Sequence, residues 1–185
     1  MRISGGKFGG RGIVAPRGMD TRPTTDKVRQ AVFNMLVHSG FAPPLEGARV
    51  IDLFAGSGAL GLEAASRGAS FVLFIDEAAA ARAAIRGNVE ALGLGGMSRI
   101  WRRDATRLGE CAPMRPFDLA FIDPPYGKGL AVAALASLAG GGWLRSGALA
   151  VVEESKRGEF SAPDGFEPVK ERAYGDTVVR FLAFQ

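Results

Sequence analysis

Short apolar runs recur along the chain from about residue 49 onward and are separated by stretches with a different spacing of apolar positions. The runs are short and rich in β-branched, leucine and aromatic residues, and glycine or proline lies between several of them. Runs of this length and composition are typical of buried β-strands. They predict strands at residues 49–54, 70–75, 99–102, 117–122, 148–153, 169–174 and 178–184.

Apolar residues at helical spacing fill the intervals between these runs. Val28, Val32 and Leu36 predict a first helix, which Thr24 or Thr25 can cap. Further helices are predicted after the glycine turn up to about residue 66, at residues 77–92 and at residues 130–138. Strands and helices that alternate at this spacing predict an α/β fold, in which a mostly parallel seven-stranded sheet is covered by helices on both faces.

The last two predicted strands are separated only by Gly175-Asp176, which predicts a hairpin and an antiparallel edge to the sheet. No internal repeat and no boundary of a second domain is visible. We therefore expect residues 1–185 to form a single domain, in which an N-terminal arm and the first helix (about residues 1–40) precede the sheet.

The composition excludes several classes of protein. No apolar run approaches the roughly 20 residues of a membrane span, and the N-terminus lacks the apolar core of a secretory signal. One cysteine, Cys111, and one histidine, His38, make an internal disulfide, a metal site and a Ser-His-Asp triad poor expectations. We expect a cytoplasmic protein without a metal, which acts as a monomer.

Positive charge is concentrated at the N-terminus. Residues 1–30 contain seven Lys or Arg and two Asp, a net charge of +5, whereas the rest of the chain carries −1. Four glycines lie among the first ten residues, so we expect a flexible arm whose cations, such as Arg11, follow a polyanion. A solvated terminus without a partner is the alternative interpretation of the same charge.

The tetrapeptide Asp123-Pro124-Pro125-Tyr126 follows a predicted buried strand. Proline fixes φ and has no N–H, so the loop is stiff and its carbonyls remain free to accept hydrogen bonds. A carboxylate, a carbonyl and an aromatic face beside one another suit a planar base that carries an exocyclic amine. We expect Asp123 and Pro124 to hold the amine, and Tyr126 to stack on the base.

A second motif follows the first predicted strand. Gly56, Gly58 and Gly61 satisfy the G-x-G-x-x-G pattern of dinucleotide-binding proteins, which favours a nicotinamide cofactor. Asp52 argues against that interpretation, because a carboxylate near the helix N-terminus would repel a pyrophosphate. S-adenosylmethionine has no phosphate and carries an ammonium and a sulfonium, which Asp52 would attract. The motif predicts that residues 52–58, including Phe54 and Ser57, surround this cofactor.

Two further acids follow predicted strands. Asp76 ends the second strand, where its two oxygens can accept both ribose hydroxyls, and Asp104-Ala105 follows the third strand, where it can receive the adenine amine. Either aspartate could instead cap a helix. Because the carboxyl ends of parallel strands meet at one edge of a sheet, these acids are expected to form a row with Asp52 and Asp123.

These motifs carry a family resemblance. D-L-F-A-G-S-G at residues 52–58 and D-P-P-Y at residues 123–126 resemble the class I S-adenosylmethionine-dependent methyltransferases that modify exocyclic amines, which have a Rossmann-like fold. The chain also resembles the RsmD family of 16S ribosomal RNA guanine-N2 methyltransferases. The segments that carry this likeness are R-I-S-G-G-K-F at 2–8, R-P-T-T-D-K-V-R at 22–29 and F-A-G-S-G-A-L-G-L-E-A at 54–64. The resemblance covers essentially the whole chain.

The resemblance implies the reaction and the substrate. It implies methyl transfer to a guanine N2 amine in 16S rRNA, within the small ribosomal subunit or an assembly intermediate. Arg22, Thr24 and Arg29, together with Arg11 and Pro125, are then expected to contact the RNA. Asp76 stands where many relatives have Glu, and Gln30 replaces a common acid.

Three alternatives stay open at this point. An adenine-N6 methyltransferase would use the same acceptors for the amine, although the chain has no room for a separate target-recognition region. A nicotinamide oxidoreductase would explain the glycines, and a non-catalytic RNA-binding protein would explain the basic arm.

Overall fold

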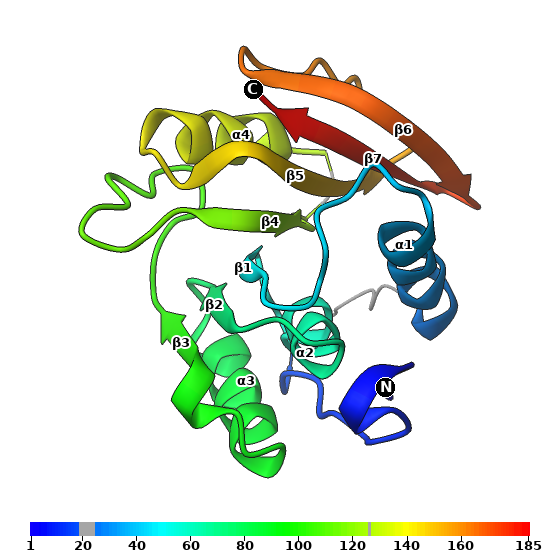
Figure 1. Cartoon of the computed structure of the whole chain (residues 1–185), viewed down its shortest axis with the longest axis vertical. Coiled ribbons are helices and arrows are strands. Elements are labelled where there is room, and N and C mark those ends of the chain that lie inside the picture. The colour runs from blue at the N-terminus through cyan, green and yellow to red at the C-terminus, as the bar shows by residue number, and fades with distance from the viewer. Residues whose placement is uncertain (19–24, 126) are drawn as a thin grey trace.

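The computed structural model describes residues 1–18, 25–125 and 127–185, and a seven-stranded mixed sheet forms its centre (Figure 1). The helices are α1 (Asp26–His38), α2 (Ala59–Ser66), α3 (Ala79–Ala91) and α4 (Leu130–Gly140), with short 3-10 turns at Gly6–Phe8 and Gly95–Met97. The strands are β1 (Arg49–Leu53), β2 (Phe71–Ile75), β3 (Ser98–Trp101), β4 (Phe117–Ile122), β5 (Leu144–Ser155), β6 (Phe166–Tyr174) and β7 (Thr177–Phe184).

The strand order is β3-β2-β1-β4-β5-β7-β6. Strands β1 to β5 are parallel, whereas β7 pairs antiparallel with both β5 and β6. The chain builds the sheet outward from β1 to β3 and then returns to place β4 on the other side of β1. Ligands of open α/β sheets bind beside the carboxyl ends of the strands at such a reversal, so the fold directs attention to the ends of β1 and β4.

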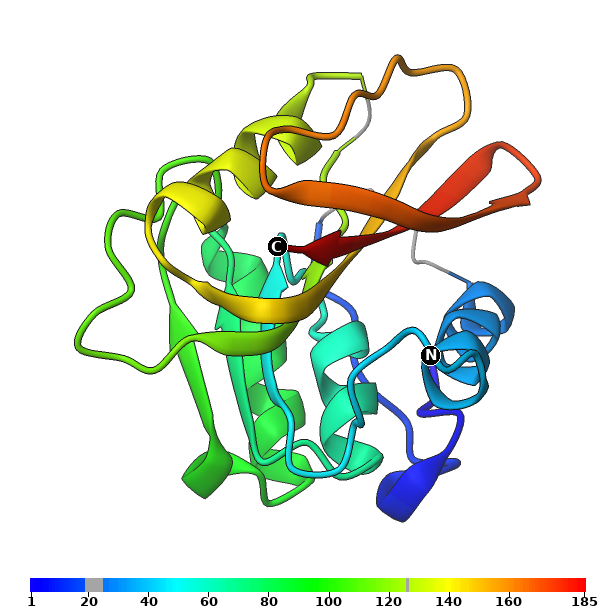
Figure 2. The same cartoon turned by 45° about the horizontal axis from the view of Figure 1, so that its top comes forward.

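Helices cover both faces of the sheet, as predicted (Figures 1 and 2). Helices α1, α2 and α3 pack on one face, where Phe33 of α1 contacts Phe121 of β4 with ring centroids 5.5 Å apart. Helix α4 packs on the other face through buried residues that include Leu135 and Leu138. The parallel strands are therefore buried on both sides, which is why they appear in the sequence as continuous apolar runs.

The predicted elements are confirmed; β6 begins three residues before its predicted start, and the largest difference is at β5. This strand begins at Leu144, four residues before the predicted start, and Arg145 to Gly147 are exposed. Leu144 pairs with Phe117 and Leu149 pairs with Leu119, so the residues of β5 between these two pairs bulge out of register beside β4. The exposed residues carry no apolar pattern, so this irregular start of the strand was not visible in the sequence.

Helix α1 begins as predicted at one of the two threonines. The Thr25 side chain accepts a hydrogen bond from the Val28 N–H at 3.2 Å and caps the helix. Thr24, the other candidate, lies outside the described residues, as does Arg22.

The expectation of a flexible N-terminal arm is wrong for its described part, residues 1–18. Its backbone folds back on itself, with the Ile3 N–H 2.9 Å from the Arg11 carbonyl oxygen, and Ile3 is buried. Gly6 has a φ of +75° and lies so close to α2 that a Cβ atom there would be 2.1 Å from the Ser66 carbonyl oxygen. The lack of a Cβ atom at Gly6 therefore allows the arm to pack closely on α2 and does not make the arm flexible.

Candidate functional site at the carboxyl edge of the sheet

The carboxyl ends of four of the parallel strands, β1 to β4, are in register. Leu53 of β1 pairs with Ile75 of β2 and Ile122 of β4, and Ile75 pairs with Trp101 of β3. The residues that follow these strands therefore leave the sheet at one edge, which can be followed in Figure 1. This alignment is the condition for the row of strand-end acids that the sequence predicts.

The turn between β1 and α2 has an unusual backbone. Phe54 has a φ of +54°, which a bulky residue rarely adopts, and Gly56 and Gly58 have φ values of +59° and +81°. A non-glycine residue in the left-handed region costs of order 1–3 kcal/mol and persists where the surroundings fix it. The strained turn bends the chain sharply at the sheet edge, where a ligand can approach the backbone.

The third glycine of the motif has a different role. A Cβ atom on Gly61 would lie 2.5 Å from Cε1 of Phe74 and 2.8 Å from Cγ1 of Val72. Gly61 therefore allows α2 to pack directly on β2, and it fixes the height of the helix above the sheet.

Internal acceptors occupy the N–H groups of all three glycines. The Gly56 N–H donates to Asp76 Oδ2 at 2.9 Å, the Gly58 N–H to the Ala55 carbonyl at 2.7 Å, and the Gly61 N–H to Asp52 Oδ2 at 3.0 Å. A pyrophosphate cradle needs such N–H groups free and no carboxylate beside them. The turn thus fits a cationic ligand without phosphate and does not fit a dinucleotide.

Asp52 is almost completely buried beneath this turn, with 1% of its surface exposed. Burial raises the pKa of its carboxyl to about 8, the Gly61 hydrogen bond opposes that rise, and the nearby Asp76 carboxylate adds to it. Two acids that share one site disfavour a second negative charge and favour a cation. This is the property that the ammonium of S-adenosylmethionine would use.

Asp76 and Asp104 both organise the backbone that follows their strands. Asp76 Oδ1 accepts a hydrogen bond from the Ala78 N–H at 2.9 Å, and Asp104 Oδ1 accepts from the N–H and Oγ1 of Thr106 at 2.9 and 2.7 Å. The Thr106 hydrogen bonds lower the pKa of Asp104, so it is ionised at neutral pH. Each oxygen has more than one lone pair, so these contacts leave capacity for hydroxyl or amine donors. Ala105 is buried beside Asp104.

Asp123 directly follows β4, so it leaves the same edge as Phe54 and Asp76. Asp123 is half-buried, Pro124 is buried and Pro125 is exposed. Tyr126 lies outside the described residues. The structure thus brings the Asp-Pro-Pro segment next to the end of β1, across the point where the strand order reverses.

Glu153, the next acid along this edge, is not among the site residues predicted from the sequence. Ile122 pairs with Val152, so Glu153 of β5 lies beside Asp123 on the neighbouring strand. Glu153 is buried, with 8% of its surface exposed, and both acids take part in polar or charged interactions within the protein. An acid at the end of an apolar strand was the available signal, but only the β4–β5 pairing connects it to Asp123.

Arg29 is not where an RNA contact requires it. Its side chain is fully buried, and its Nε lies 3.4 Å from Glu63 of α2. The Glu63 carboxylate also accepts hydrogen bonds from Ser4, Gly5 and Arg67 at 2.7–3.0 Å. Arg29 therefore joins α1 to α2 and the N-terminal arm, and its burial argues against the predicted contact with phosphates. The local sequence around Arg29 shows only a cation on a helix, so burial of its side chain was not visible there.

Arg11, by contrast, is exposed and donates a hydrogen bond to the Ala91 carbonyl at 3.0 Å. Asn88 of α3 holds the arm close to the glycine turn, because its amide bonds to both Val14 and the Ser57 carbonyl at 2.8–2.9 Å. The packed arm therefore presents its cations from a fixed position near the glycine turn.

No cluster of three or more His, Cys, Asp or Glu side chains with the geometry of a metal site occurs among the described residues. In the same part of the chain, no helix has the length and apolar character needed to cross a bilayer.

Comparison with known proteins identifies relatives over the full fold. Residues 1–183 match the family model described as "Conserved hypothetical protein 95". Ribosomal RNA small subunit methyltransferase D of Escherichia coli K12 is 34% identical over 97% of this chain and 88% of its own. The structure of Escherichia coli yhhF superposes with a TM-score of 0.84 and 33% identity, covering 100% of this chain and 98% of that one.

A more distant structure shares the fold alone. Magnesium protoporphyrin IX methyltransferase from Synechocystis, solved with bound SAM, is 19% identical and has a TM-score of 0.64 over 86% of this chain and 79% of its own.

Proposed function

Because this chain belongs to the ribosomal RNA small subunit methyltransferase D family, and so is a methyltransferase, we propose that it methylates the N2 amine of a guanine in 16S rRNA with S-adenosylmethionine. The observation that carries the proposal is the common register of Leu53, Ile75 and Ile122. It brings the acid-lined glycine turn and the Asp123-Pro124 acceptors to neighbouring strand ends. A cationic donor and an amine acceptor can therefore meet there.

The residues at the end of β1 fit the cofactor. Asp76 supplies negative charge, and a cation bound beside Asp52 favours the ionised form of that carboxyl. The N–H groups of Gly56 and Gly61 are already used by these side chains. S-adenosylmethionine, when bound, supplies an electrophilic methyl group on a sulfonium. We assign its ammonium end to the neighbourhood of Asp52, its ribose hydroxyls to Asp76 and its adenine amine to Asp104-Ala105.

Asp123 and Pro124 are assigned to the target amine. The lone pair of an exocyclic amine is delocalised into the ring, which makes the nitrogen a poor nucleophile. The Asp123 carboxylate and the Pro124 carbonyl can each accept one N–H of the amine, which favours a pyramidal nitrogen and directs its lone pair away from both acceptors. Asp123 is also the nearest assigned group that can take the proton lost from the methylated nitrogen. Tyr126 and Pro125 are assigned to the base itself.

Glu153 gives a physical reason for guanine rather than adenine. Guanine presents an N1–H donor beside its N2 amine, whereas adenine presents an N1 acceptor beside its N6 amine. A carboxylate next to Asp123 can accept the guanine N1–H but would face the lone pair of adenine N1. We therefore assign Glu153 to the recognition of guanine, which the Asp123 and Pro124 acceptors cannot provide by themselves.

The RNA surface is assigned to the exposed cations of the N-terminal arm. Arg2, Lys7, Arg11 and Arg17 are exposed, and the arm that carries them is anchored next to the glycine turn. Cations fixed beside a base pocket can hold the flanking phosphates while the target base leaves its stack. Arg22 and Thr24 keep the role that the family resemblance gives them. The substrate that we propose is the small subunit or its assembly intermediate, modified in the cytoplasm by a monomer.

The assignment is tested by transfer of labelled methyl groups to small subunits that lack the modification, followed by nucleoside analysis. We expect N2-methylguanosine from the wild-type protein. We expect a loss of about 100-fold or more in kcat for Asp123→Ala, on the scale of removing one positioned electrostatic group, with unchanged affinity for S-adenosylhomocysteine. Recovery of N6-methyladenosine would contradict the substrate, and full activity of Asp123→Ala would contradict the role of Asp123.

Glu153 is tested with an RNA whose target guanine is replaced by 2-aminopurine, which keeps the amine but has no N1–H. The wild-type protein should prefer guanine by roughly 10- to 100-fold in kcat/KM, the value of one hydrogen bond to a charged group. Glu153→Ala should lose this preference, whereas the neighbouring Glu154→Ala variant should keep it. An unchanged preference in Glu153→Ala would remove Glu153 from base recognition.

A further inference from the structure

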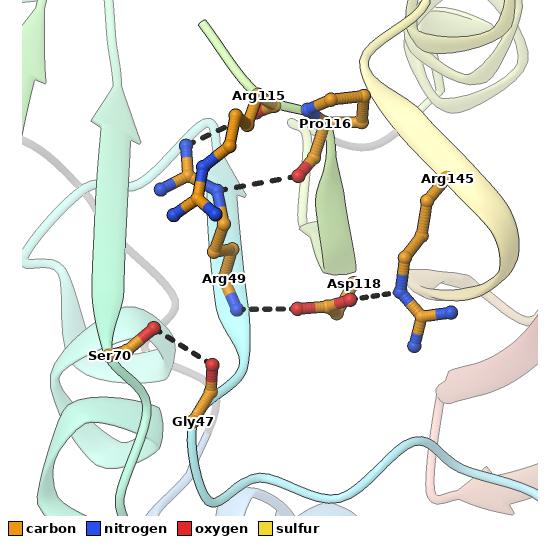
Figure 3. A pocket seen from close by; sticks show the side chains of 7 residues that line it. All are labelled: Gly47, Arg49, Ser70, Arg115, Pro116, Asp118 and Arg145. Carbon is orange, nitrogen blue, oxygen red and sulfur yellow. Dashed lines mark hydrogen bonds and ion pairs between the residues drawn. The ribbon is translucent and has the colours of Figure 1, made fainter.

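A pocket of about 370 Å³ lies at the opposite edge of the sheet from Asp123, where β1, β2, β4 and β5 begin (Figure 3). Its charged lining residues are Arg49, Arg115, Arg145 and Asp118. The lining thus carries three guanidinium groups and one carboxylate, and the methyl-transfer chemistry assigned above uses none of them.

The single carboxylate in this lining already has partners within the protein. Asp118 accepts a hydrogen bond from the backbone N–H of Arg49 at 2.8 Å and forms an ion pair with Nε of Arg145. Across the described ranges of the chain, the ion pairs include neither the Arg49 nor the Arg115 side chain. Two of the three cations in the pocket thus lack a protein counter-charge at ion-pair distance.

Neutral groups hold Arg49 in place. Its Nη2 donates to the Arg115 carbonyl at 3.1 Å and its Nε to the Pro116 carbonyl at 3.4 Å. Its guanidinium also lies 4.7 and 4.9 Å from the ring centroids of Phe71 and Phe117. A cation fixed in this way loses little conformational entropy when it binds an anion.

The positive charges of the pocket also repel one another. Burial lowers the pKa of Arg49, and the charge of Arg115 lowers it further. In Figure 3 the Arg115 side chain extends beside that of Arg49. An anion in the pocket would offset both the burial of Arg49 and its repulsion from Arg115.

We propose that this pocket binds a backbone phosphate of the RNA substrate and forms a second contact with the RNA, far from the target base. Arginine donors match the geometry of phosphate oxygens. Phe117, one of the two rings beside Arg49, is fully buried, so the pocket offers little surface for stacking a base. The proposal rests on the RNA substrate assigned above.

The position of the pocket determines which RNA can use it. The five residues of β1 separate the two edges of the sheet, which at about 3.3 Å per residue corresponds to roughly 15 Å. An RNA that fills both sites must therefore extend at least this far from the target base.

The test compares two double variants that lose the same charge. Arg115→Gln with Arg145→Gln removes two cations of the pocket, and Lys170→Gln with Arg172→Gln removes two exposed cations of the edge strand β6. Filter binding measures the Kd of each protein for unmodified small subunits as a function of salt. We expect the pocket variant to bind more weakly and its log Kd to depend on log salt with a slope lower by about one per lost phosphate contact. The control variant and the affinity for S-adenosylhomocysteine should be unchanged.

Three outcomes would overturn the proposal. The pocket variant could bind subunits with the wild-type Kd and slope, or the control variant could weaken binding equally, which would indicate net charge alone. Inorganic phosphate could also bind the wild-type pocket, as observed by calorimetry, while subunit binding does not respond to the variant, which would identify a site for a small anion. Because binding is measured without methyl transfer, an inactive wild-type protein that still binds subunits would contradict the proposed function and leave this contact intact.

Discussion

The carboxylate of Asp52 lies 3.0 Å from the backbone nitrogen of Gly61 and joins the end of β1 to the first turn of α2. This hydrogen bond connects the two halves of the proposed cofactor site, the acid and the glycine turn. It also holds the acid in a buried position where its charge is costly.

The first prediction concerns stability and pH. The pKa of Asp52 rises from 3.8 to about 8 on folding, so the folded state holds this proton more tightly than the unfolded chain. The contribution of Asp52 to stability is therefore full below about pH 4 and is lost as the pH rises toward 8. Asp52→Asn keeps an acceptor for Gly61 and cannot ionise. We expect the Tm of the wild type to fall relative to this variant between about pH 4 and 8, and a constant difference would contradict the raised pKa.

The second prediction concerns the cofactor. A cationic ligand favours the ionised form of Asp52, so its binding should release a proton from wild-type protein near pH 7. The ammonium of the ligand can also exchange protons on binding, and the Asp52→Asn variant corrects for it. Calorimetry with S-adenosylhomocysteine in buffers of different ionisation enthalpy counts the protons. We expect weaker binding and less proton release for the variant; equal values in both proteins would separate Asp52 from the cofactor.

The third prediction compares two helical glycines. Gly61→Ala would place a Cβ atom 2.5 Å from Phe74, and overpacking of this kind costs about 1–3 kcal/mol. We expect urea unfolding to show that loss, together with weaker binding of S-adenosylhomocysteine, because α2 carries the turn. Gly87→Ala in α3 is the matched control. Its Cβ atom would meet nothing within 4 Å, so the unfolding free energy should rise by roughly 0.5–1 kcal/mol. A stable Gly61→Ala protein would show that α2 can move away from β2 without cost.

The fourth prediction concerns the buried ion pair between Arg29 and Glu63. Both side chains have no exposed surface, and Arg29 Nη1 has no hydrogen-bond partner within the described part of the chain. Removing one member of such a pair leaves a buried charge and costs about 3–5 kcal/mol. We expect Glu63→Gln to lose this amount in urea unfolding, and Arg29→Met combined with Glu63→Gln to lose less than the sum of the two single changes. Additive losses would show that the two side chains act independently.

Local pattern predicted most of the fold and part of the candidate site. The apolar runs identified the strands because parallel strands are buried on both faces, and the helical spacing identified α1 to α4. Asp76 and Asp123 could be assigned to one edge because strands in a parallel sheet end together. Asp52 and the three glycines could be connected because they are close in sequence.

Three features depended on contacts between residues far apart in the sequence. The glycines of the N-terminal arm suggested flexibility, but Glu63 binds Ser4 and Gly5, which are almost 60 positions away. Arg29 is likewise buried against Glu63, although the family resemblance had implied an RNA contact. Glu153 acquired a role only through the pairing of β5 with β4.

The sequence by itself therefore determined which acids follow the ends of the parallel strands, because side-chain type and the rule that parallel strands share an edge are both local or generic. The tertiary structure alone decided which cations stay exposed, which acid lies beside Asp123 and where Arg49, Arg115 and Arg145 converge. Those outcomes follow from long-range packing and strand register, which place residues by their partners rather than by their neighbours in the chain.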